Sequence, residues 1–183
     1  FLYSYNKNNS NLRNLSDIKT PGIYATCGSL GHGLPVAVGW AIAKKIKHEK
    51  GYIYCLVGDG ELNEGSMWES LNLIRSKKLN NMVLVIDKNR FQALGLCKDI
   101  IYFEENFLLK DKEFHVQEIN GHDLDEILIS YDNINPNKPN IIIANTKKGG
   151  TISFMQDSNI WHYCKIDKES LDKAILEIEK NGY

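Results

Sequence analysis

The sequence lacks the features by which membrane-embedded, secreted and nucleic-acid-binding proteins are usually detected. It contains no apolar run long enough to span a bilayer, and no charged, apolar and then small-residue start of the kind that marks a signal peptide. Its net charge is only -1, with 22 Lys and Arg against 23 Asp and Glu. Because no basic excess is present, we expect neither nucleic acid nor a membrane surface as a partner.

Cysteine is also scarce. The four cysteines are widely separated and form no CxxC pair; they are Cys27, Cys55, Cys97 and Cys164. This spacing argues against a disulfide framework and against a structural zinc site. It favours a reducing compartment, and we therefore expect a cytoplasmic protein.

The 183 residues are enough for one α/β domain with a real hydrophobic core. Residues 1–20 are polar and rich in Asn, without a clear period, and are predicted to form an N-terminal arm. Residues 21–183 carry the hydrophobic runs, and we predict a single domain over this range.

Apolar runs and helical patterns alternate along this domain. Continuous apolar runs predict buried strands at 52–57, 82–86 and 140–144. Helices are predicted at 34–47, from Glu61 to about residue 79, and at 170–180. This alternation indicates an α/β fold, a parallel sheet with helices on both faces. Ligands of such sheets bind beyond the carboxyl ends of the strands.

A short glycine motif follows the first predicted strand. Gly58 and Gly60 flank Asp59, and a helix is predicted to begin at Glu61. The glycines allow a tight turn and a close approach of the backbone to a ligand, and a helix start offers free N–H groups to an anion. Taken alone the motif is weak, because Asp-Gly at a strand end is also a common turn.

The second part of the pattern lies about thirty residues later, where Asp87-Lys88-Asn89-Arg90-Phe91 follows the next predicted strand. A βαβ unit has about this length, so Asp59 and Asn89 are expected at the same edge of the sheet. A carboxylate, an amide oxygen and a backbone carbonyl suit Mg²⁺, which leaves positions open for phosphate oxygens. No Walker loop is present, and the glycines of 28–33 do not have the nicotinamide-binding spacing.

With these residues in place, the sequence resembles the N-terminal subunit of the split transketolase family, from about Pro21 to its end. The motif that begins Gly-Asp-Gly and ends in Asn is typical of enzymes that use thiamine diphosphate. Segments in the order and context of the family are 28–34, 58–65, 87–92 and 120–123, followed by 148–150, 153–155 and 161–162.

The resemblance implies a ligand set and a division of roles. Mg²⁺ would be bound by Asp59, Asn89 and the backbone carbonyl of Phe91. Thiamine diphosphate would be bound by residues of both glycine segments, by the metal ligands and by the late loop; they are Gly28, Ser29, Leu30, Gly58, Asp59, Gly60, Glu61, Asn89 and His162. Catalytic roles would fall to Glu64 and Glu69, which resemble acidic residues linking paired active sites, and to His162.

The resemblance further implies transfer of a two-carbon ketol unit between sugar substrates. It implies a partner subunit that carries the pyrimidine-binding domain, within a homo- or hetero-oligomer. The sequence departs from the family in having no histidine before His32, whereas the family has a Gly-His-Pro stretch where residues 13–16 lie. Two alternatives therefore stay open: another thiamine diphosphate enzyme, of the 2-oxo acid dehydrogenase or decarboxylase type, and a cofactor-binding module without catalysis.

Overall fold

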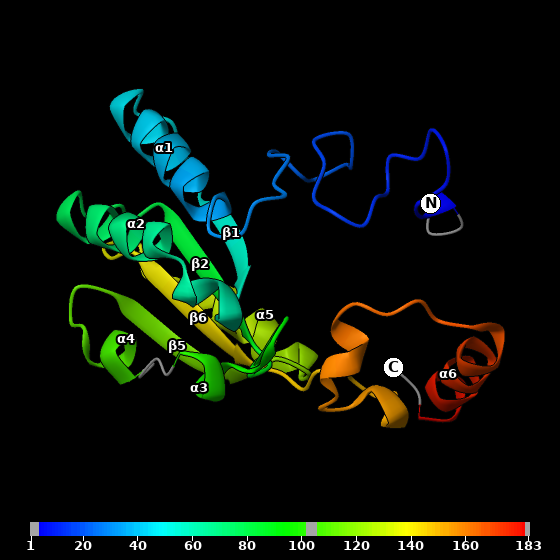
Figure 1. Ribbon diagram of the computed structural model, residues 1–183. Coiled ribbons are helices and arrows are strands. Elements are labelled where there is room, and N and C mark those ends of the chain that lie inside the picture. Colours follow the sequence, from blue (N-terminus) through cyan, green and yellow to red (C-terminus); the bar gives the residue numbers. More distant parts are fainter. Residues whose placement is uncertain (1–3, 102–105, 182–183) are drawn as a thin grey trace.

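The centre of the structure is a parallel sheet of four strands (Figure 1). The structure is a computed structural model, and it describes residues 4–101 and 106–181. The strands in spatial order are β1 (Ile53–Gly58), β2 (Met82–Lys88), β6 (Asn140–Asn145) and β5 (His115–Asn120). Every neighbouring pair in this sheet runs parallel. The predicted α/β class is therefore confirmed, and so are the three predicted strands.

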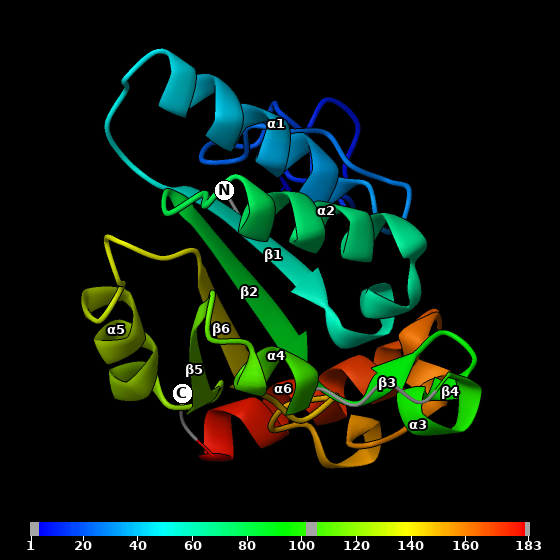
Figure 2. The ribbon, with the colours of Figure 1, turned by 90° about the vertical axis from the view of Figure 1, so that its left-hand side faces the viewer.

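Helices cover both faces of the sheet (Figure 2). On one face, α1 (Gly33–Ile46) and α2 (Gly65–Ser76) bury apolar side chains against the strands. The short α4 (Asn106–Lys110) adds Leu108 to the same core. On the other face lies α5 (Leu124–Asp132), whose buried Ser130 accepts a hydrogen bond at its carbonyl from the Gln117 side chain of β5.

The segment after β1 differs from its prediction. The helix expected from Glu61 to about residue 79 is divided into a 3₁₀ helix, η2 (Asp59–Asn63), and α2, with Glu64 extended between them. Leu62 holds η2 in place, because its side chain is buried and its carbonyl accepts a hydrogen bond of 2.9 Å from the Trp68 indole. This contact between residues six positions apart interrupts the helical pattern, so the chain turns around the strand end before α2 begins.

Strand β5 and helix α5 were not predicted. The β5 sequence His-Val-Gln-Glu-Ile-Asn contains no continuous apolar run, because this strand lies at the edge of the sheet and is only half-buried. Helix α5 does carry an N-terminal signal, since the Asp123 carboxylate accepts hydrogen bonds from the amides of Asp125 and Glu126.

The first strand is buried on only one of its faces. Cys55 and Val57 belong to the core, whereas Tyr54 and Leu56 are 53% and 72% exposed on the opposite face. Tyr54 makes an edge-on contact with Tyr131 of α5, with 5.7 Å between ring centroids. The expectation of a fully buried strand at 52–57 was therefore wrong, because β1 is the other edge of this sheet and α5 packs mainly against β5.

The chain beyond β6 lies past the carboxyl ends of the strands (orange and red in Figure 1). It contains η3 (Ser153–Met155), η4 (Asn159–His162) and α6 (Lys168–Asn181), so the predicted last helix is confirmed. Phe154 and Trp161 pack edge to face here, with centroids 5.3 Å apart. A two-stranded hairpin, β3 (Phe91–Gln92) and β4 (Gly95–Leu96), and the short α3 (Cys97–Ile100) complete the elements.

Residues 4–32 contain no named helix or strand. The arm at 1–20 stays a prediction, and its residues 1–3 lie outside the described ranges. An isolated bridge joins Ser16 to Cys27. The boundary at residue 21 stays a prediction, and the predicted domain ends with residues 182–183, which are not described. No helix within the described ranges is long and apolar enough to cross a membrane.

The Asn140 side chain generates a stability prediction. It is 1% exposed, accepts a hydrogen bond from the Asn135 amide at 2.8 Å, and donates to the carbonyls of Asn135 and Lys138. We expect Asn140→Ala to lower the free energy of unfolding by about 2–3 kcal/mol, because three backbone groups of residues 135 and 138 lose the partner that the buried Asn140 provides. Urea unfolding measures this change. The exposed Asn137→Ala is the control and should stay within about 0.5 kcal/mol of the parent; equal effects of the two variants would contradict the prediction.

Candidate functional site

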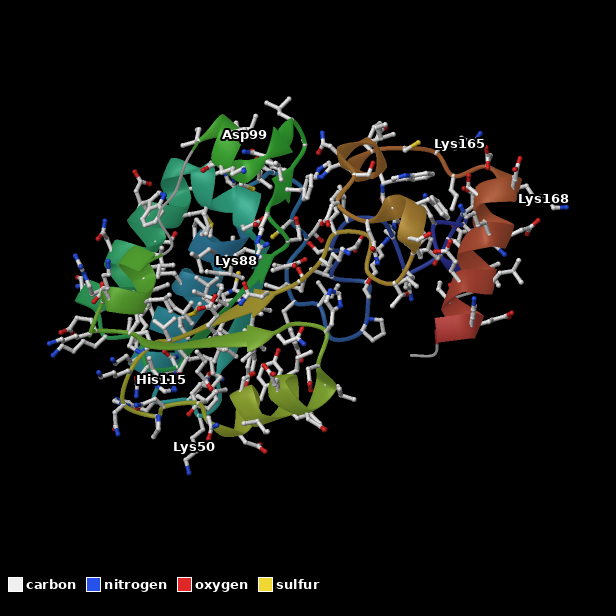
Figure 3. All side chains as sticks on the ribbon, turned by 90° about the horizontal axis from the view of Figure 1, so that it is seen from below. Lys50, Lys88, Asp99, His115, Lys165 and Lys168 are labelled. Atoms are coloured by element: carbon white, nitrogen blue, oxygen red, sulfur yellow. The ribbon has the colours of Figure 1, made fainter. Side chains whose placement is uncertain are left out.

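Polar residues meet at the edge of the sheet that is formed by the carboxyl ends of its four strands. The strand register places Gly58 opposite Asp87, Asp87 opposite Ala144, and Asn120 opposite Asn145. The segments that follow these positions therefore leave the sheet at the same edge. Figure 3 shows Lys88, the last residue of β2, at this edge. At the opposite edge it shows Lys50, which precedes β1, and His115, the first residue of β5.

The Asp59 carboxylate joins the ends of β1 and β2. Asp59 is 8% exposed, and its Oδ1 accepts a hydrogen bond of 2.9 Å from the Gly60 amide. Its Oδ2 accepts one of 2.5 Å from the amide of Arg90, which lies two residues beyond β2. The predicted convergence of Asp59 with the segment around Asn89 is thus present in the structure.

The Asn89 side chain shapes the turn that Asp59 contacts. Its Oδ1 accepts a hydrogen bond of 2.9 Å from the Phe91 amide, while Arg90 adopts a positive φ of 71°. Gly60 lies against this turn so closely that a Cβ there would come within 2.6 Å of the Gln92 Cβ and 3.7 Å of the Phe91 carbonyl oxygen. Asp59, Asn89 and the Phe91 carbonyl, the three predicted metal ligands, therefore belong to one compact unit.

The electrostatics of this unit suit a bound cation. Burial raises the pKa of the Asp59 carboxyl above its ordinary value, although hydrogen bonds from Arg90, Gly60 and the Cys97 side chain act in the opposite direction. A buried carboxylate gains from a cation beside it. In residues 4–101 and 106–181, no group of three or more His, Cys, Asp and Glu side chains could hold a metal. The predicted set is of another kind, with one carboxylate, one amide oxygen and one backbone carbonyl.

The glycine loop at 28–33 approaches the same unit. His32 closes a turn by donating its amide to the Ser29 carbonyl at 3.3 Å. Gly31 has a φ of +77°, its amide donates to Glu61 Oε1 at 2.7 Å, and its carbonyl accepts from Ser66 Oγ at 2.7 Å. The loop residues predicted to bind a cofactor are thereby fixed relative to the segment that follows Asp59.

The loop that carries His162 lies beside the β3–β4 hairpin. Helix η4 contacts β3, and the Asn159 side chain donates a hydrogen bond of 3.0 Å to the Ala93 carbonyl. The Nδ1 of His162 is 3.3 Å from the Lys148 ammonium. Partial burial and then the Lys148 charge lower the pKa of His162, so the imidazole is neutral near pH 7 and able to accept a proton.

Glu64 and Glu69 are placed differently from the metal-binding residues. Glu64 is half-buried at the start of α2, and Glu69 is exposed on the same helix. Neither carboxylate forms a hydrogen bond or ion pair with another residue of the described ranges. Their proposed function between paired active sites stays a prediction, since that contact needs a second chain.

Some residues at this edge were not found by sequence reasoning. The Ser66 hydroxyl contacts a loop 35 residues earlier, and no local pattern reveals such a pair. The exposed His122 is a further structural residue at this edge, because its Nε2 accepts a hydrogen bond of 2.8 Å from the Lys147 amide and so holds the loop after β6. It lies two residues beyond the end of β5, a strand that sequence reasoning missed.

Comparison with known protein families places the geometry in context. Residues 16–175 match the family described as transketolase, thiamine diphosphate binding domain. One of the subunits of the apulose-4-phosphate transketolase of Actinobacillus succinogenes is 41% identical over 167 residues, which cover 88% of this chain and 59% of that protein. The 6-deoxy-6-sulfo-D-fructose transketolase subunit SqwG of a Clostridium species is 36% identical, covering 90% of this chain and 61% of that protein.

Solved structures agree with this placement. Transketolase from Campylobacter jejuni superposes with a TM-score of 0.85 at 29% identity, covering 96% of this chain and 29% of that chain. The present chain spans about 59% of the length of the Actinobacillus relative. The shared region therefore includes the whole sheet and the polar edge, but only part of each relative.

The contact between His162 and Lys148 generates a titration prediction. We expect Lys148→Met to raise the pKa of His162 toward its ordinary value, because the neighbouring positive charge disfavours the imidazolium. NMR titration of the imidazole carbon-bound protons measures the shift. Lys147→Met is the matched control, since the Lys147 ammonium bonds to Gln156 at 2.7 Å. The assignment would be wrong if the two variants gave the same titration curve.

Proposed function

Because the chain belongs to the family of transketolase thiamine diphosphate-binding domains, we propose that it is the diphosphate-binding component of a split transketolase. Its activity is the transfer of a two-carbon ketol unit from a ketose to an aldose acceptor. A cytoplasmic location, expected from the dispersed cysteines, is part of the same proposal. The Actinobacillus and Clostridium relatives are named as transketolase subunits for a sugar phosphate and for a sulfosugar, which supports a sugar with an anionic end as substrate.

The observation that carries the proposal is the Asp59 carboxylate, buried at the end of β1 and bonded to the turn that contains Asn89. We propose that Asp59, the Asn89 side chain and the Phe91 carbonyl hold Mg²⁺. The ion would neutralise the diphosphate and fix its position, with the backbone of Gly58 and Gly60 alongside. When bound, thiamine diphosphate supplies the carbon nucleophile that cleaves the C2–C3 bond of the ketose and retains the two-carbon unit.

The remaining predicted residues take part around this centre. Gly28, Ser29 and Leu30 would line the thiazolium side, since their loop is fixed next to the metal unit by Gly31. His162 would face the diphosphate and substrate from the loop beside β3. Its neutral imidazole can accept a proton from a substrate hydroxyl near pH 7.

A partner subunit with a pyrimidine-binding domain is part of this proposal. Small-molecule sites usually enclose most of the ligand surface, and the described edge offers one side of such a site. Apolar side chains on three of its loops are strongly exposed: Leu30 by 56%, Leu94 by 78% and Ile160 by 74%. Exposed apolar side chains on the loops around a polar site suit a surface that another chain covers. Glu64 and Glu69 would then meet their counterparts within an oligomer.

The metal assignment is testable with the isolated chain. We expect thiamine diphosphate to bind in the presence of Mg²⁺, and we expect either EDTA or Asp59→Ala to reduce the affinity at least tenfold, because a divalent ion loses its only carboxylate ligand. Isothermal titration calorimetry measures the effect. Asp99→Ala, which removes an exposed carboxylate on α3, is the control. Unchanged affinity in Asp59→Ala would reject the proposed metal site.

The reaction type requires the partner subunit. With a pyrimidine-domain partner present, we expect two-carbon transfer from a ketose phosphate to an aldose acceptor. Chromatography of the product sugars measures this transfer. Decarboxylation of 2-oxo acids without ketol transfer would favour the alternative enzyme class. Cofactor binding without turnover of either substrate class would favour a module that has lost catalysis, in keeping with the absence of any histidine before His32.

A further inference from the structure

Gly31 is held from both sides by side chains from the segment that follows β1. Its amide donates a hydrogen bond of 2.7 Å to Glu61 Oε1, and its carbonyl accepts one of 2.7 Å from Ser66 Oγ. Glu61 belongs to η2 and Ser66 to the first turn of α2. Both polar groups of one peptide position are therefore satisfied by residues about thirty positions away in the sequence. We call this arrangement the Gly31 clamp.

The backbone leaves little freedom at Gly31. Its φ of +77° lies in the left-handed region, and a Cβ there would come within 2.6 Å of both the Glu64 Cβ and the Ser66 Oγ. A side chain at this position would meet backbone strain and collision together. The two hydrogen bonds of the clamp therefore hold Gly31 against η2 and against the first turn of α2.

We propose that Glu61 and Ser66 are positioning residues that act through Gly31 to set the separation between the two cofactor-binding segments. This inference rests on the proposed function, in which Gly28–Leu30 bind the thiazolium side and Asp59–Gly60 the diphosphate side. The two segments come from different parts of the chain. The Gly31 clamp joins them directly, with Glu61 only two residues beyond Asp59.

The chemistry of the contact distinguishes positioning from direct binding. An amide N–H needs only an oxygen acceptor, and a glutamine provides one at the same position. A carboxylate that bound Mg²⁺ or balanced a cofactor charge would instead need its negative charge. Glu61→Gln should therefore preserve the function of Glu61 if it acts through Gly31, whereas Glu61→Ala should remove it.

The experiment combines cofactor affinity with amide exchange. By calorimetry with Mg²⁺ present, we expect Glu61→Ala to bind thiamine diphosphate about tenfold more weakly, and Ser66→Ala several-fold more weakly, because each loses one hydrogen bond of the loop. Glu61→Gln should stay within about threefold of the parent. In the cofactor-free chain, hydrogen–deuterium exchange should show the Gly31 amide protected in the parent and in Glu61→Gln, and unprotected in Glu61→Ala.

The outcomes separate three cases. The amides of β2 serve as an internal control, because loss of their protection would reveal global unfolding and not a loosened loop. If Glu61→Ala unfolds in this way, Ser66→Ala tests the Gly31 clamp through its other hydrogen bond. Parent-like affinity in Glu61→Ala despite faster exchange at Gly31 would overturn the positioning role, as would equal weakening by Glu61→Gln and Glu61→Ala. If the parent chain bound no thiamine diphosphate, the proposed function would fall and the cofactor role with it, while the exchange data would still report whether the clamp forms.

Discussion

The hydrogen bond between the Asp59 carboxylate and the Arg90 amide determines the arrangement of the functional edge. It connects the end of β1 to the turn after β2 across 2.5 Å, and the remaining loops are arranged around it. Gly60 packs against that turn, and η2 begins at Asp59 itself. The glycine loop is joined to η2 by the hydrogen bond from the Gly31 amide to Glu61. A buried carboxylate is costly to keep ionised, and the divalent cation proposed above would offset that cost at Asp59.

The two ends of the sheet are specialised for different tasks. At the amino ends, polar side chains satisfy backbone groups and close the loops: Asn140 bonds the chain before β6, and the Lys45 ammonium donates to the carbonyls of Lys77 and Lys78 at the end of α2. At the carboxyl ends, polar side chains hold the loops that follow the strands against one another. Asp59 and His122 each accept a backbone amide from a different segment. This division is expected of parallel sheets, in which ligands bind beyond the carboxyl ends.

Sequence reasoning was most successful where one local pattern decides the structure. The apolar runs of β2 and β6 are buried in the middle of the sheet, and both were predicted. The glycine motif around Asp59 and the Asn89 turn were placed at one edge because the βαβ geometry leaves little choice. Sequence reasoning failed where contacts with other residues determine the structure. Strand β5 has a mixed sequence because it is an edge strand, and η2 interrupts a helical pattern because Leu62 is held by Trp68. The Gly31 clamp had no local signal, because Glu61 and Ser66 lie 30 and 35 residues after Gly31 in the sequence.

The exposed face of β1 has a consequence for the behaviour of the chain in concentrated solution. Among the described residues β1 pairs only with β2, and Tyr54 and Leu56 stand outward beside its open edge. An open edge with apolar side chains is a template for pairing with another strand and is a recognised origin of aggregation. A net charge of -1 provides almost no electrostatic repulsion between molecules. Whatever covers the open edge and the exposed face of β1 would therefore also remove one template for aggregation.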